Sequence, residues 1–126
     1  MQIVLAVAFG GAFGAVGRHF MNVAATHWFG HGFPWGTILV NILGSLLMGC
    51  LVSLLAHVWQ PSMEIKAFLT VGLLGAFTTF STFSLDIVTL FERQDYLPMA
   101  GYMAGSLCLS ILGLILGMFL IRMIVL

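Results

Sequence analysis

Apolar residues occupy four long runs of the chain, and short polar connections separate them. The runs cover residues 3–25, 37–58, 65–91 and 98–125. About 20 helical residues are enough to cross the roughly 30 Å hydrocarbon core of a bilayer, and each run is long enough. The pattern therefore predicts one all-α membrane domain, residues 1–126, with four transmembrane helices.

The overall composition supports a membrane protein. Hydrophobic residues make up 61% of the chain and charged residues only 6%, and the mean hydropathy is +1.15. These values exclude an ordinary soluble domain. The first apolar run follows Met-Gln without a basic leader, so we expect a retained helix and not a cleaved signal peptide.

The third run contains an unusual polar stretch, GLLGAFTTFSTFS, at residues 72–84. It brings glycines and five hydroxyl side chains into a segment that should cross the membrane. Glycine, β-branched threonine and competing side-chain hydrogen bonds all weaken a helix. We therefore expect a break near residues 75–79. Unwound backbone in a bilayer needs protein, water or an ion to satisfy its carbonyls.

Polar residues also repeat every fourth position in two other runs. Thr37, Asn41 and Ser45 form such a stripe in the second run. A buried amide must face another helix or a water-filled path, and the stripe favours the path for Asn41. A second stripe lies beside a glycine repeat in the fourth run, and it indicates a polar track more than three separate bonds to backbone carbonyls: Tyr102, Ser106 and Ser110.

Further candidates lie around the predicted break. Phe80 and Phe83 share a helix face, as packing residues or as part of a polar path, and Ser81 and Ser84 repeat their spacing. Asp86 follows, and we interpret it as an accessory residue at the mouth of a path and not as a proton carrier. Elsewhere, Arg18 is either an anchor at the membrane surface or a vestibule cation.

These groups favour transport. The sequence offers no nucleophile with a base, no carboxylate pair and no phosphate-binding loop, so an enzyme is not expected. Several neutral donors in series, with positive ring edges, suit a small, hard anion. Carbonyls at a helix break suit a hard cation instead, and two copies meeting there could hold one.

The positive charges are divided evenly between the two faces of the membrane. Lys66 and Arg122 belong to the face of the termini, and Arg18 and Arg93 to the opposite face. This balance gives no positive-inside preference, so the chain could insert both ways and form an antiparallel dimer. A single orientation fixed by other features is the alternative.

The residues described above resemble those of the Fluc (CrcB) fluoride channels. The resemblance rests on TTFSTFS at residues 78–84, GTILVN at 36–41 and GAVGR at 14–18, and it extends over essentially the whole chain. It implies a dual-topology antiparallel homodimer in the bacterial plasma (inner) membrane. It further implies two fluoride pores, one central structural Na⁺ and passive export of cytoplasmic fluoride.

The resemblance also implies roles for individual residues. Ala76 and Asp86 depart from the family pattern, where glycine and glutamate are frequent. The pore residues implied by position, together with the hydroxyls of the polar stretch, are Thr37, Asn41, Phe80, Ser81, Thr82, Phe83, Ser84, Tyr102, Ser106 and Ser110. Arg18 corresponds to a vestibule arginine, and Gly75 and Thr78 to the backbone carbonyls that bind sodium.

Two other functions are open to a small four-helix membrane protein. A small multidrug exporter coupled to protons needs a carboxylate within the membrane, usually in its first helix, and residues 3–25 contain none. A non-conducting scaffold subunit would explain the glycines but would leave the hydroxyl stripes without a role. The expected partners are fluoride, lipid and a second copy of the chain, and not nucleic acid.

Overall fold

The computed structural model describes all 126 residues and is entirely helical. Three helices are continuous: α1 (Gln2–Phe29), α2 (Trp35–His57) and α6 (Tyr96–Val125). The third span consists of four pieces in sequence: α3 (Met63–Ala67), the π-helix η1 (Phe68–Leu74), α4 (Gly75–Phe77) and α5 (Ser81–Glu92).

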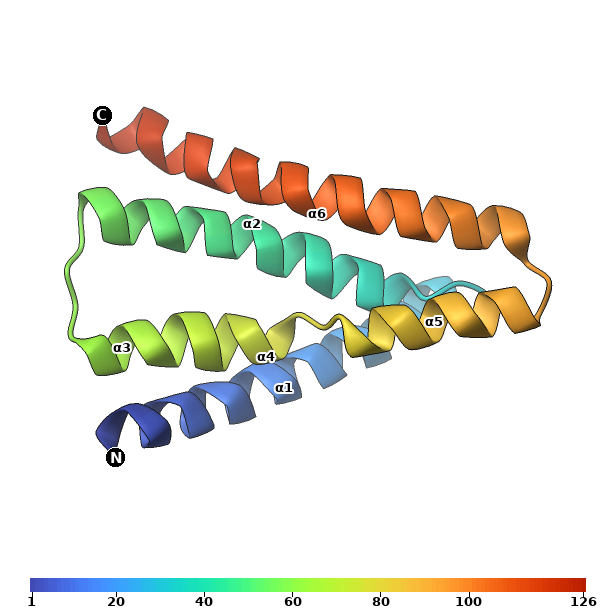
Figure 1. Ribbon diagram of the computed structural model, residues 1–126, viewed down its shortest axis with the longest axis horizontal. Helices are drawn as coiled ribbons and strands as arrows, with labels where there is room; N and C mark the ends of the chain where they lie inside the picture. The colour runs from blue at the N-terminus through green and yellow to red at the C-terminus, as the bar shows by residue number, and fades with distance from the viewer.

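The four spans lie side by side (Figure 1). Both termini and the connection from α2 to α3 lie at one end, and the other two connections lie at the opposite end. Each of the segments Gln2–Phe29, Trp35–His57, Met63–Glu92 and Tyr96–Val125 is long and apolar enough to cross a membrane. The predicted fold of four spanning helices, with the third one broken, is confirmed.

The first helix is longer than the predicted run and includes His27, which the sequence pattern had assigned to a loop. Gly30 stops the helix with φ +83°. This positive φ is open to glycine without a steric penalty.

Small residues allow the helices to pack closely. A side chain at Gly14 would collide with the carbonyl of Leu73 in η1, and one at Gly117 would collide with the carbonyl of Leu46 in α2. Ala76, the departure from the family pattern, fits beside Gly14. The glycine patterns in the first and fourth runs thus mark two helix contacts, α1 with η1 and α2 with α6.

A single chain buries little of its apolar surface. Only 17 of 126 residues are buried, and most large hydrophobic side chains are exposed. A soluble protein would not leave so much apolar surface in water. The exposed side chains therefore match a lipid environment or contact with a second copy.

The third span is interrupted between α4 and α5, at residues 78–80, which overlaps the later part of the predicted interval of 75–79. Gly75 is still helical, and its N–H bonds to the carbonyls of Gly72 and Thr70. The chain leaves the helix at Thr78, which is extended with φ −83° and ψ 160°, and helical geometry resumes at Phe80 before α5 begins. The π-helix before the break was not predicted.

Candidate functional site

The break is held by a side chain from another span. The Nδ2 of Asn41 donates to the carbonyl of Thr79 at 2.9 Å, and the N–H of Thr79 donates to Oδ1 of Asn41 at 2.8 Å. Both backbone groups of Thr79 are therefore satisfied inside the bundle, as backbone at membrane depth requires. Asn41 thus bridges α2 to the break, and one N–H of its amide is left over.

The hydroxyl of Thr79 caps the helix that follows the break. Its Oγ1 accepts from the N–H of Thr82 at 3.2 Å and donates to Oγ1 of Thr82 at 3.2 Å. It also lies 3.4 Å from Oγ of Ser81. A threonine that accepts from the N–H three residues later is a typical N-cap. This residue stabilises α5 and gathers two neighbouring hydroxyls.

These bonds leave two carbonyls without their helical donors. In a continuous helix, the carbonyl of Gly75 would accept from the N–H of Thr79, and the carbonyl of Thr78 from the N–H of Thr82. Both N–H groups bond to side chains instead. Arg18 reaches the Thr78 carbonyl only through a long bond of 3.4 Å from Nη1.

A groove of about 330 Å³ runs past the break, and we call it the break groove. Ser106 and Ser110 line it, and their hydroxyls are buried without a hydrogen-bond partner in the protein. The Phe80 ring is 73% exposed and the Phe83 ring 5%, and their centroids lie 5.5 Å apart. The groove brings together the following candidate residues: Asn41, Gly75, Thr78, Phe80, Phe83, Ser106 and Ser110.

The other candidate residues lie outside the lining of the break groove. The hydroxyls of Ser81 and Thr82 lie within hydrogen-bond reach of the Thr79 hydroxyl, and Thr79 lines the groove. Ser84 donates its hydroxyl to the Phe80 carbonyl at 3.0 Å, which is the local back-bond expected of a serine in a helix. Arg18 lies next to the break through its bond to Thr78.

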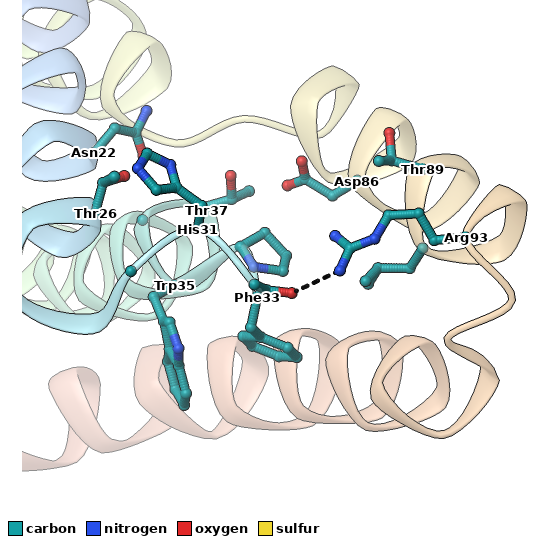
Figure 2. A pocket seen from close by; sticks show the side chains of 14 residues that line it. Asn22, Thr26, His31, Phe33, Trp35, Thr37, Asp86, Thr89 and Arg93 are labelled. Atoms are coloured by element: carbon teal, nitrogen blue, oxygen red, sulfur yellow. Dashed lines mark hydrogen bonds between the residues drawn. The ribbon is translucent and has the colours of Figure 1, made fainter.

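A second cavity, of about 250 Å³, lies near the far end of α5, and we call it the mouth cavity. Figure 2 shows Asp86 of α5 and Arg93, which directly follows α5, reaching into this space opposite the loop that carries His31. Thr37 lines the cavity as well, so the stripe of the second span is divided between the two hollows.

Asp86 connects the mouth cavity to the fourth span. Its Oδ2 accepts a hydrogen bond from the hydroxyl of Tyr102 at 2.8 Å, and Tyr102 is fully buried. At the rim, Arg93 pairs with Asp95 at 2.9 Å and donates to the Gly32 carbonyl at 3.5 Å. Asp86 thus has a specific partner at the mouth.

Sequence reasoning did not single out three residues at these two hollows. Thr79 was only one hydroxyl among several, although threonine is a favoured residue at the start of a helix. Asn22 and Thr26 line the mouth cavity. They follow Arg18 at intervals of four, so the same spacing that revealed the other stripes could have revealed this one.

Comparison with known proteins identifies the family. A model of the CrcB-like protein family, described as Camphor Resistance (CrcB), matches residues 5–118. A protein of Rhodospirillum centenum named fluoride-specific ion channel FluC is 52% identical over 97% of both chains. A protein with the same name from Nitrobacter winogradskyi is 46% identical over 96% of both chains. Another, from Agrobacterium fabrum, is 48% identical over 92% of this chain and 93% of its own length. The predicted resemblance is confirmed, and the chain belongs to the CrcB-like family.

Proposed function

We propose that this protein is a fluoride-selective passive ion channel that exports cytoplasmic fluoride. The relatives described above are named fluoride-specific ion channels, and none of the three is named as an enzyme. The main structural support is the break groove, where the buried Ser106 hydroxyl has no protein partner and faces the same space as Asn41 and Phe80.

Physical chemistry favours a small anion in this groove. A bare ion loses tens of kcal/mol of hydration in an apolar medium, and each hydrogen bond to a charged group returns about 1.5–3 kcal/mol. Asn41, Ser106 and Ser110 provide donors in series along the groove. The positive edges of the Phe80 and Phe83 rings add further attraction. Together these groups replace water around fluoride in successive steps.

The remaining candidate residues extend the path from the groove to both ends. Arg18 beside the break attracts anions, and Tyr102 and Thr37 connect the groove to the mouth cavity. Ser81 and Thr82 supply hydroxyls gathered by Thr79. Ser84 contributes least, because its hydroxyl is already bonded to a backbone carbonyl.

A second, antiparallel copy completes the path. The break groove is open along the surface of one chain, and the Phe80 ring is mostly exposed there. A partner inserted in the opposite orientation would cover the ring and close two equivalent pores. The even distribution of positive charge between the two ends supports such dual topology.

The freed carbonyls of Gly75 and Thr78 fit a central Na⁺ between the two copies. Both residues line the break groove, and both carbonyls lack their helical donors. Two copies would offer four such oxygens to a hard cation. The long hydrogen bond from Arg18 leaves a lone pair on the carbonyl oxygen of Thr78 available. When bound, the cation would supply positive charge that attracts anions to the nearby pores.

Fluoride efflux from liposomes at fixed voltage tests the function. The purified protein should release fluoride without a proton gradient, and the rate should not change when such a gradient is imposed. Vesicles that retain their fluoride would contradict the proposal. Proton-dependent efflux of an organic cation would support the multidrug exporter, although α1 has no acidic residue and the Asp86 carboxylate is bonded to Tyr102.

A further inference from the structure

We propose that Thr79 is a positioning residue that keeps the third span open and orients the pore donors. It fixes the Asn41 amide through its peptide groups. It also helps to withdraw two N–H donors from the carbonyls of Gly75 and Thr78. The consequences for fluoride and Na⁺ rest on the proposed function, whereas the bonding at the break does not.

The first donor is withdrawn through the backbone of Thr79. Its N–H points to Oδ1 of Asn41, so the carbonyl of Gly75 has no helical donor. Its C=O accepts from Nδ2 of the same amide. Because the N–H and the C=O of the same residue pair with the two ends of the amide, the amide cannot rotate without losing both bonds. The free N–H of Asn41 therefore has a fixed direction at the groove that this residue lines.

The second donor is withdrawn by the side chain of Thr79. Its hydroxyl accepts the N–H of Thr82, which would otherwise close on the carbonyl of Thr78. Thr78 is extended, with ψ 160°, so its carbonyl is turned out of the helix direction. Glycine alone does not explain the break, since Gly75 is helical with φ −63° and ψ −37°.

The same hydroxyl organises two other hydroxyls. Oγ1 of Thr79 bonds to Oγ1 of Thr82 and lies within reach of Oγ of Ser81. Thr79 itself lines the break groove beside Asn41. One threonine thus connects the α2 amide, the two carbonyls without helical donors and the hydroxyls at the start of α5.

Three variants of the full-length protein test this proposal. Thr79→Val removes the hydroxyl and keeps the shape, and Thr79→Ser restores a hydroxyl. Thr70→Val is the matched control, because Thr70 lies in η1 and lines neither hollow, and its hydroxyl bonds to the Lys66 carbonyl. Each is measured by amide hydrogen exchange over residues 75–84, by the Na⁺ dependence of thermal unfolding, and by the initial rate of fluoride efflux.

We expect the backbone amides of Thr79→Val to exchange faster across the break. The variant should also need about ten-fold more Na⁺ for half-maximal stabilisation, and its fluoride flux should fall about ten-fold. Both changes are consistent with the loss of one hydrogen bond. Thr79→Ser and Thr70→Val should stay close to the unaltered protein in all three measurements. A general loss of stability would not shift the Na⁺ dependence, so that shift identifies a positioning role.

Hydrogen exchange separates this proposal from the proposed function. If Thr79→Val exchanges across the break like the unaltered protein, or if Thr79→Ser behaves like Thr79→Val, the positioning role is overturned. A wild-type Na⁺ dependence in Thr79→Val also overturns it. If the unaltered protein releases no fluoride, the proposed function fails, and faster exchange in Thr79→Val alone still supports the role of Thr79 at the break.

Discussion

The break groove and the mouth cavity use different chemistry, although the same spans build both. The groove is lined by an amide, hydroxyls, backbone and phenyl rings, without a charged side chain, whereas the mouth cavity contains Asp86 and Arg93. Charged groups are costly at membrane depth and are tolerated nearer its surface. We therefore expect neutral donors to act where water is excluded, and charge to act where the ion is still hydrated.

If this comparison is correct, removing a neutral donor from the groove should cost more than removing a charge from the mouth. Asn41→Leu should have the largest effect, a loss of fluoride flux of about 100-fold or more, since it removes a proposed pore donor and leaves the N–H and C=O of Thr79 unsatisfied. Efflux from liposomes measures the loss, and size-exclusion chromatography checks that the variant still forms the proposed dimer. Unchanged flux would contradict a pore role for Asn41.

Phe80→Ile should lower flux by about ten-fold, because an aliphatic side chain keeps the volume but lacks the positive ring edge. The control is Phe91→Ile, which alters another exposed ring of α5 that contacts Tyr96 and does not line the groove. Equal flux in both variants would reduce the Phe80 ring to a packing role.

Ser106→Ala should lower flux by a few-fold, because one neutral donor in the series is lost. Ser53→Ala is a sharp control, since Ser53 also has a buried hydroxyl without a partner but lies outside the groove. Thermal unfolding should be similar in the two variants. If Ser53→Ala reduces flux as much as Ser106→Ala, the groove is not the path.

Hydropathy was sufficient to predict the four spans, because about 20 apolar residues in a row have few structural alternatives. The polar stretch at residues 78–84 was also recognised, since hydroxyls and weak helix formers stand out in an apolar run. These features depend on neighbouring residues along the chain, and local sequence contains that information.

Features that depend on contacts between distant residues were not predictable in the same way. The partner of Asn41 is Thr79, 38 positions away, and only the folded bundle brings them together. The π-helix η1 packs closely against α1 at Gly14, a contact that local sequence does not show. The exact start of the break follows from which N–H groups find side-chain acceptors, and composition alone does not specify that choice.

The smallest predicted effect belongs to the mouth cavity. Arg93→Gln should lower flux by no more than about two-fold, because the guanidinium is exposed and paired with Asp95, and exposed pairs contribute little. The effect should be measurable at low ionic strength and should vanish near 1 M salt, where screening acts over about 3 Å. Arg122→Gln is the control, because Arg122 lies in the last turn of α6, at the opposite end of the helix bundle. A large loss that persists in high salt would mean that charge acts directly on a dehydrated ion, and the division between a neutral groove and a charged mouth would be wrong.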